Sequence, residues 1–173
     1  YFQKLGARIV ASTKAQADQK ARADYHLTRL GGLIKQSLEG TNPVVATEVF
    51  ETQKNIELGD VKLELYYFGS AHTAGDIFIY MPSEQIMFTG DIVFNDRMLG
   101  IGPARNSQSW VNVFDKMANF KPKHIVPGHG HVSDLPTATK NTQSYLKFLI
   151  HEVVKILDSD GDMLQASKID QTD

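Results

Sequence analysis

The sequence contains no cysteine, which excludes disulfide bonds and thiolate metal ligands. Any metal site in this chain therefore has to use imidazole and carboxylate groups. The absence does not identify the compartment, because both cytosolic and exported proteins can lack cysteine. The first residue is Tyr rather than Met, so an upstream signal peptide would be invisible and the cellular location is unknown from the sequence.

Strong net charge and long apolar runs are also missing. The formal net charge is −2 and the basic residues are scattered, whereas nucleic acids and anionic membranes select clustered Lys and Arg. No apolar run approaches the roughly 18–20 residues that a membrane span needs, and the longest runs, residues 77–81 and 86–88, are strand-sized. We therefore expect neither nucleic acid nor a membrane as a partner.

The size and composition of the chain are those of one globular domain. With 173 residues, 42% hydrophobic and 22% charged, we expect a single domain over residues 1–173. An apolar, strand-like run at residues 8–11 is followed by Thr13 and Gln16, which have capping-box spacing. Good helix formers then predict a helix from Lys14 to about Leu38, with a break at the glycine pair of residues 31–32.

The remaining segments alternate between strand and helix patterns. Strands are predicted at residues 44–50, 61–67, 77–81, 86–89 and 124–127, with a hairpin turn at residues 82–85. Helical spacing of apolar residues occurs at residues 107–120 and 137–157. This order of elements predicts a layered α/β fold with helices packed on sheet faces.

Three candidate metal ligands each follow a predicted strand. His72 lies between two predicted strands, Asp91 follows residues 86–90, and His129 follows residues 124–127. Strand ends present side chains to loop-lined clefts, so we expect the three side chains to converge. Imidazole together with carboxylate suits Zn²⁺, Fe or Mn²⁺ better than Ca²⁺.

Each candidate taken alone has a simpler interpretation. A single histidine near a glycine is more often a surface or hydrogen-bonded residue than a ligand, and Asp91 after glycine is also typical of a turn or cap. The joint pattern is stronger, because three independent coincidences would have to fall at strand ends. Thr73, Asp76 and Thr89 are placed either to orient the imidazoles or to make ordinary turn hydrogen bonds.

Three segments carry a resemblance to a known family. Residues 71–76 (Ala-His-Thr-Ala-Gly-Asp), 88–91 (Phe-Thr-Gly-Asp) and 127–130 (Pro-Gly-His-Gly) resemble the last three metal motifs of the metallo-β-lactamase-fold hydrolases. The similarity extends through nearly the whole chain. It implies an αβ/βα layered sandwich and a metal-dependent hydrolase acting on a small-molecule substrate.

The resemblance also implies roles for the candidate ligands. His72 completes the shell of the first metal ion, Asp91 bridges both ions as the catalytic carboxylate, and His129 belongs to the second ion. Two zinc ions are expected, with Fe or Mn as alternatives. Such a pair lowers the pKa of a shared water towards neutrality and clamps the substrate oxygen.

The family's His-x-His-x-Asp-His motif is absent from the sequence and is expected immediately before Tyr1. We therefore expect the chain to be truncated at the N-terminus and incomplete at both ends. Without those ligands, the 173-residue chain is expected to be inactive. A sheet edge exposed by the missing part would also favour self-association.

The substrate class follows from two positions. Asp91 resembles the glyoxalase II-like and broader hydrolase branches, whereas the best-known lactamases of this fold carry Cys there and Lys in place of Phe94. This favours an ester, thioester or amide over a β-lactam. An iron-dependent oxidoreductase on the same fold and a non-catalytic fragment or binding module remain alternatives.

Arg97 is interpreted either as a contact for an anionic substrate or as a surface ion pair with Asp96 or a neighbour.

Overall fold

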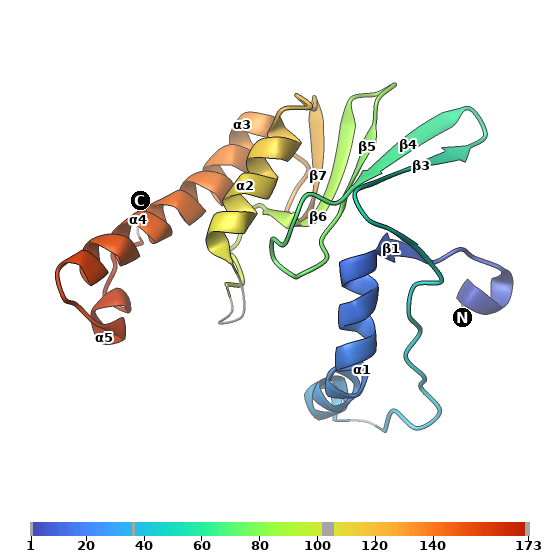
Figure 1. Cartoon of the computed structure of the whole chain (residues 1–173), viewed down its shortest axis with the longest axis horizontal. Helices are drawn as coiled ribbons and strands as arrows, with labels where there is room; N and C mark the ends of the chain where they lie inside the picture. Colours follow the sequence, from blue (N-terminus) through green and yellow to red (C-terminus); the bar gives the residue numbers. More distant parts are fainter. Residues whose placement is uncertain (1, 36, 102–105, 172–173) are drawn as a thin grey trace.

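The computed structural model describes residues 2–35, 37–101 and 106–171. It contains a five-stranded sheet, a separate pair of short strands and several helices (Figure 1). The strands are β1 (Val10–Ser12), β2 (Glu48–Phe50), β3 (Gln53–Leu58), β4 (Val61–Tyr66), β5 (Phe78–Met81), β6 (Ile86–Phe94) and β7 (His124–His129). The helices are the 3-10 helix η1 (Phe2–Leu5), α1 (Thr13–Ile34), α2 (Ser107–Ala118), α3 (Leu135–Ala138), the π-helix η2 (Thr139–Ser144), α4 (Tyr145–Asp158) and α5 (Met163–Ala166).

The five-stranded sheet has the order β3-β4-β5-β6-β7. Strands β3 to β6 pair in antiparallel fashion, whereas β6 and β7 are parallel. The small sheet is a parallel pair of β1 and β2. Because β6 and β7 run in the same direction, their carboxyl ends reach the same edge of the sheet, and these ends carry Asp91 and His129.

Helix α2 packs on one face of this sheet with the start of α4 beside it, and the core lies between α2 and the sheet (Figure 1). Successive side chains of a strand point to opposite faces. Met87 and Thr89 of β6 are buried on the helix-covered face, whereas Phe88 is 39% exposed on the other. Trp110 and Phe114 of α2 are fully buried against the sheet. The core therefore lies directly behind the strand that carries Asp91.

Helix α1 differs from the sequence prediction in two ways. It continues through Gly31 and Gly32 without a break, and it ends at Ile34. Lys35 adopts the left-handed conformation and donates its backbone N–H to the Gly31 carbonyl, at 2.9 Å. Glycine costs only about 1 kcal/mol in a helix interior and keeps its N–H donor, so a glycine pair does not interrupt the hydrogen-bond ladder.

The capping residue of α1 is Ser12 rather than Thr13. The Ser12 hydroxyl accepts a hydrogen bond from the Ala15 amide at 3.1 Å. The Thr13 hydroxyl instead lies 2.9 Å from a carboxylate oxygen of Glu51. The predicted capping box begins one residue too late. The spacing pattern alone does not distinguish which of two adjacent hydroxyl residues is the N-cap and which is the first residue of the helix.

The strands agree with the sequence except in the region before β4 and at the end of β6. The predicted strand at residues 44–50 pairs only over Glu48–Phe50, and β3 was not expected. Strand β3 lies at the sheet edge and is mostly exposed, so it lacks the apolar alternation that reveals a half-buried strand.

Among the helices that the structure describes, none combines the length and the apolar character that a membrane span requires.

Candidate metal centre

Strand β6 does not end at Thr89, as predicted from the sequence, but continues to Phe94. Its register with β7 shifts on both sides of Gly90, and Gly90 has a left-handed φ of 49°. Glycine adopts this conformation without a steric cost. Irregularities of this kind re-aim side chains and are frequent beside active sites. Asp91 therefore projects from a bulged segment of the strand rather than from a loop after it.

His129 is the last residue of β7 and pairs with Phe94 of β6. Its carbonyl accepts a hydrogen bond from the Asn95 amide at 2.9 Å. The neighbouring Gly128 packs directly against Asp91, because a Cβ built on Gly128 would lie 2.1 Å from the Asp91 Oδ1 atom. The two strands thus fix the carboxylate and the imidazole relative to each other.

His72 lies in the loop between β4 and β5, which is held by contacts to two distant elements. The Ser109 hydroxyl of α2 donates to the Ser70 carbonyl at 2.7 Å, and the Ser12 hydroxyl donates to the Gly75 carbonyl at 2.8 Å. A Cβ on Gly75 would lie 2.2 Å from the Ala15 amide nitrogen. The start of α1 therefore packs so closely on the loop that only glycine fits.

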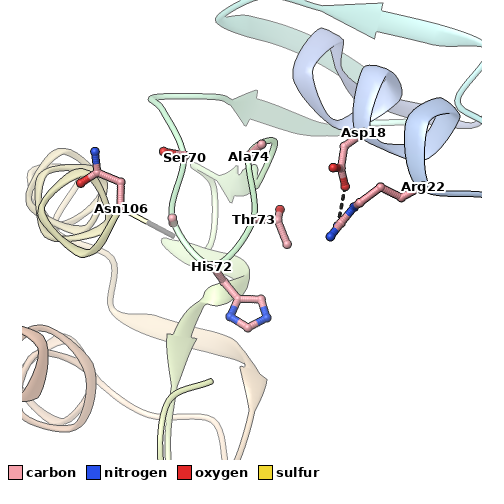
Figure 2. A pocket seen from close by; sticks show the side chains of 8 residues that line it. Asp18, Arg22, Ser70, His72, Thr73, Ala74 and Asn106 are labelled. Atoms are coloured by element: carbon pink, nitrogen blue, oxygen red, sulfur yellow. Dashed lines mark hydrogen bonds and ion pairs between the residues drawn. The ribbon is translucent and has the colours of Figure 1, made fainter. Parts of the chain in front are cut away.

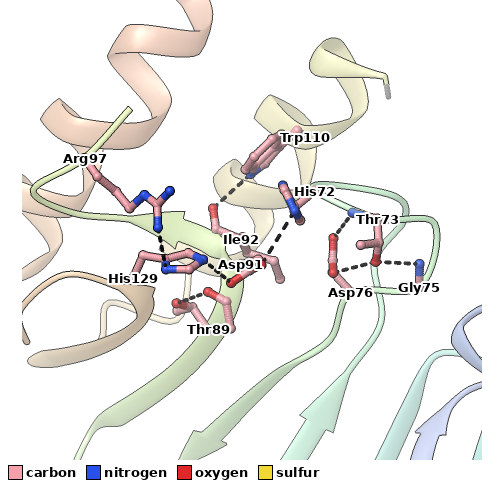
Figure 3. Close-up of polar contacts among 11 residues, drawn as sticks. His72, Thr73, Gly75, Asp76, Thr89, Asp91, Ile92, Arg97, Trp110 and His129 are labelled. Carbon is pink, nitrogen blue, oxygen red and sulfur yellow. Dashed lines mark hydrogen bonds and ion pairs between the residues drawn. The ribbon is translucent and has the colours of Figure 1, made fainter. Parts of the chain in front are cut away.

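The residues considered as orienting groups make turn and backbone hydrogen bonds. The Thr73 hydroxyl donates to a carboxylate oxygen of Asp76 at 2.6 Å, which closes the turn after His72 (Figure 3). The Thr89 hydroxyl lies 3.3 Å from the Val126 carbonyl, between β6 and β7. These contacts shape the loop and the strand pair. They agree with the interpretation of these residues as ordinary turn hydrogen bonders rather than as partners of the imidazoles.

The three candidate ligands converge as the sequence predicts, with Asp91 between the two imidazoles (Figure 3). The His72 Nε2 atom lies 3.6 Å from Asp91 Oδ2, and the His129 Nε2 atom lies 3.5 Å from Asp91 Oδ1. Each carboxylate oxygen thus faces a different ring. All three side chains are partly exposed, so the group is open to solvent and to ligands.

These distances suit donors that share a metal ion. Two ligands at about 2.0–2.2 Å from a tetrahedral zinc ion are themselves about 3.4 Å apart. Each imidazole and its nearer Asp91 oxygen therefore span one edge of such a site. Within the described ranges, no group of three or more His, Asp or Glu side chains is arranged to hold a single ion. The described donors are instead arranged in two pairs, His72 with Asp91 and His129 with Asp91.

Two buried aromatic rings support the imidazoles from behind. The Phe94 ring centroid lies 5.3 Å from that of His72 and 4.6 Å from that of His129. Trp110 meets His72 edge to face at 5.6 Å, and its indole N–H donates to the Ile92 carbonyl at 2.9 Å. The sequence identifies Trp110 only as an apolar residue of a helix face, because its contact with His72 depends on how α2 packs on the sheet.

The sequence suggested an ion pair between Arg97 and Asp96 as one explanation of Arg97. The structure does not contain this pair. Asp96 instead accepts hydrogen bonds from the backbone amide of His131, at 2.9 Å, and from its ring, at 2.7 Å. The bond from the backbone amide has the larger effect, and together the two bonds hold the pKa of the Asp96 carboxyl below its usual range. The Arg97 Nη1 atom lies 3.2 Å from Nδ1 of His129, the ring nitrogen that faces away from Asp91 (Figure 3).

A hollow of about 260 Å³ lies on the His72 side of the centre, between α1 and the His72 loop (Figure 2). Asp18 and Arg22 of α1 line it together with Asn106 at the start of α2. The Arg22 guanidinium is 2.6 Å from the Asp18 carboxylate. The charges of this hollow therefore compensate each other.

The fold and the site together define an α/β protein that presents two imidazoles and a shared carboxylate at one edge of a mixed sheet. The chain belongs to the metallo-beta-lactamase superfamily, because residues 10–129, well over half of the sequence, match the profile of that family. This confirms the fold class and the family that the three motifs predict.

Individual relatives match only part of this chain, and the chain matches only part of each relative. The chain is 28% identical over 85 residues to a metallo-beta-lactamase type 2 from Bacteroides fragilis, which covers 47% of this chain and 34% of the relative. It is 31% identical over 86 residues to that from Bacillus cereus, which covers 46% and 33%. A metallo-beta-lactamase structure from Pontibacter korlensis superimposes with a TM-score of 0.60 at 23% identity, over 84% of this chain and 60% of that one. The match thus spans about a third of each curated relative, and the structural likeness concerns the fold.

Proposed function

We propose that the protein is a metal-dependent hydrolase of an ester, thioester or amide, with His72, Asp91 and His129 as part of a centre for two ions, preferably zinc. One observation carries this proposal: the two oxygens of Asp91 face two different imidazoles, at 3.6 and 3.5 Å. A carboxylate in this position is suited to lie between two cations, as in two-metal hydrolytic sites.

The chain's own residues would bind and position the ions and the substrate. Divalent ions at such a centre supply Lewis acidity and lower the pKa of water towards neutrality. The negative charge of Asp91 would offset part of the positive charge of the two ions. His72 and His129 each offer one ring nitrogen to a different ion. Phe94 is buried and packs against both rings, and the buried Trp110 packs against His72, so these contacts would limit the rotation of the imidazoles.

The preferred substrates are acyl compounds other than β-lactams. The name of the curated relatives points to a β-lactam, which is a cyclic amide. However, this chain has Asp at position 91 and Phe at position 94, where the best-known lactamases of this fold carry Cys and a substrate-binding Lys. Phe94 is only 2% exposed and packs beneath the imidazoles, so it has no surface to offer a substrate.

Zinc binding by the 173-residue chain tests the centre. We expect Asp91→Ala to lower zinc affinity more than either His72→Ala or His129→Ala, because only the carboxylate faces both positions. The expected loss for Asp91→Ala is at least about tenfold, since it removes half of the donors at each position. Equilibrium dialysis or calorimetric titration measures it. His151→Ala is the control, because this imidazole lies on α4 and is 76% exposed. Equal zinc binding by wild type and Asp91→Ala would contradict the proposed centre.

Hydrolysis by the same chain is expected to be slow even with saturating zinc. Each ion has two donors among the described residues, whereas catalytic zinc sites typically use three protein ligands. The measurement is the zinc-dependent turnover of a chromogenic ester, a thioester and a β-lactam. Turnover above about 1 s⁻¹, within the usual enzyme range, would show that the described donors suffice and that this expectation is wrong.

A further inference from the structure

One buried ring contacts both imidazoles of the candidate centre. The centroid of the Phe94 ring lies 5.3 Å from that of His72 and 4.6 Å from that of His129. Among the described residues, no other aromatic side chain contacts both imidazoles, because Trp110 meets only His72. His72 follows β4 and His129 ends β7, so a single side chain supports two segments that are far apart in the sequence.

The direction of the Phe94 side chain depends on the irregularity of β6. Successive side chains of a regular strand point to opposite faces, so residues 91 and 94, an odd number of positions apart, would point in opposite directions. Here Asp91 and Phe94 both reach the two imidazoles. The register between β6 and β7 shifts between Gly90 and Phe94, and such an irregularity re-aims the side chains beside it. The bulge thus places both groups against the same pair of rings.

Three neighbouring elements hold Phe94 in place. Its backbone amide donates to the Thr142 hydroxyl of η2 at 3.0 Å, and that hydroxyl donates to the Phe94 carbonyl at 2.8 Å. Phe94 also pairs with His129 of β7, and its ring centroid lies 5.9 Å from that of Trp110 on α2. Phe94, Thr142 and Trp110 are at most 2% exposed. Because a close-packed interior leaves little room for movement, the Phe94 ring is a fixed surface.

The imidazoles meet Asp91 and Phe94 with different parts of their rings. Each Nε2 atom faces the carboxylate (Figure 3), at 3.6 Å for His72 and 3.5 Å for His129. The planes of the two imidazoles are tilted against the Phe94 ring by 48° and 36°. The torsion that turns a histidine ring about its Cβ–Cγ bond has broad energy wells. Packing against Phe94 therefore restricts a rotation that the histidine backbone leaves free.

We propose that Phe94 is a positioning residue shared by both metal positions. It fixes the two imidazoles with Nε2 towards Asp91 before any ion binds, so that one ring sets the affinity of both positions together. This inference rests on the proposed function, because it treats His72 and His129 as metal ligands. A ligand that is already in its binding orientation loses less freedom when the ion arrives, and groups locked by packed neighbours keep their geometry.

Phe94→Leu tests the inference, because leucine keeps an apolar group at this place but offers no flat ring. In NMR spectra of the zinc-free chain, we expect the rings of His72 and His129 to hold one orientation in the wild type and to average over several in the variant. Zinc titrations followed at the ring signals of each histidine should show midpoints about tenfold higher at both positions, the usual effect of losing a group that orients metal ligands.

Phe78→Leu is the matched control. Phe78 is fully buried in the same core and stacks on Tyr66, and within the described part of the chain its ring contacts neither histidine. The same truncation should lower the free energy of unfolding to a similar extent, measured with denaturant, but change the zinc midpoints less than about twofold. If Phe94→Leu does not fold, Phe94→Met takes its place, because an unbranched side chain fills irregular space.

The outcomes separate this inference from the hydrolase proposal. If both imidazoles lose their fixed orientation in the zinc-free variant while zinc binding is independent of Asp91, Phe94 positions the rings and the proposed metal centre fails. If zinc binding depends on Asp91 but the Phe94 variant shifts neither midpoint more than Phe78→Leu does, or shifts only one, the centre stands and the inference is wrong. Unchanged ring orientations in the zinc-free variant would also contradict it.

Discussion

Gly128→Ala is expected to displace the Asp91 carboxylate and to lower zinc affinity about tenfold or more, the effect of losing a partner that orients a metal ligand. The added Cβ would lie 2.1 Å from Asp91 Oδ1 and 2.6 Å from the Gly90 carbonyl carbon. Side-chain rotation relieves the first contact only by turning Oδ1 away from His129. The second contact involves backbone, so β6 and β7 have to separate.

The same substitution should also destabilise the fold. Overpacking of a close contact costs typically about 1–3 kcal/mol, and we expect the free energy of unfolding to fall within that range. Denaturant unfolding and zinc titration of the same variant measure the two effects separately. Gly32→Ala is the matched control, because no heavy atom lies within 4 Å of its added Cβ and alanine favours a helix interior by about 1 kcal/mol. Unchanged zinc affinity in Gly128→Ala would show that Asp91 is not held by this contact.

Trp110→Ala is expected to reduce the free energy of unfolding by about 3–5 kcal/mol, the usual cost of truncating a buried aromatic residue. Trp110 is fully buried and contacts Phe94, with ring centroids 5.9 Å apart. Its loss also leaves the Ile92 carbonyl without the indole donor. Because small proteins are stable by only about 5–15 kcal/mol, the variant should lose much of its resistance to denaturant.

Trp110→Phe separates packing from hydrogen bonding. It keeps an aromatic ring in the core but removes the donor to Ile92, so we expect a smaller loss of about 1–3 kcal/mol. The His72 ring signals in NMR spectra should move in both variants, since Trp110 is 5.6 Å from that ring. Phe148→Ala on α4 is a suitable control, because this residue is 39% exposed. A loss in Trp110→Ala no larger than in Phe148→Ala would contradict the assigned role of Trp110 in the core.

Local sequence patterns correctly predict most of the strands and helices around the site. The alternation in residues 61–67 and the apolar runs around Phe78 and Met87 correspond to β4, β5 and β6. Strand β3 was missed, because an exposed edge strand has no apolar periodicity to detect. The break expected at the glycines of α1 was wrong, because glycine weakens a helix without removing a hydrogen bond.

The sequence by itself determined the family and the three candidate ligands, because each candidate stands in a short motif after a predicted strand. Only the tertiary structure decided how the ligands face one another. The bulge at Gly90 aims Asp91 between the two imidazoles. The contact between Arg97 and His129 joins residues that are 32 positions apart in the sequence. Such contacts depend on strand register and helix packing over the whole sheet, and these leave no trace in the spacing of neighbouring residues.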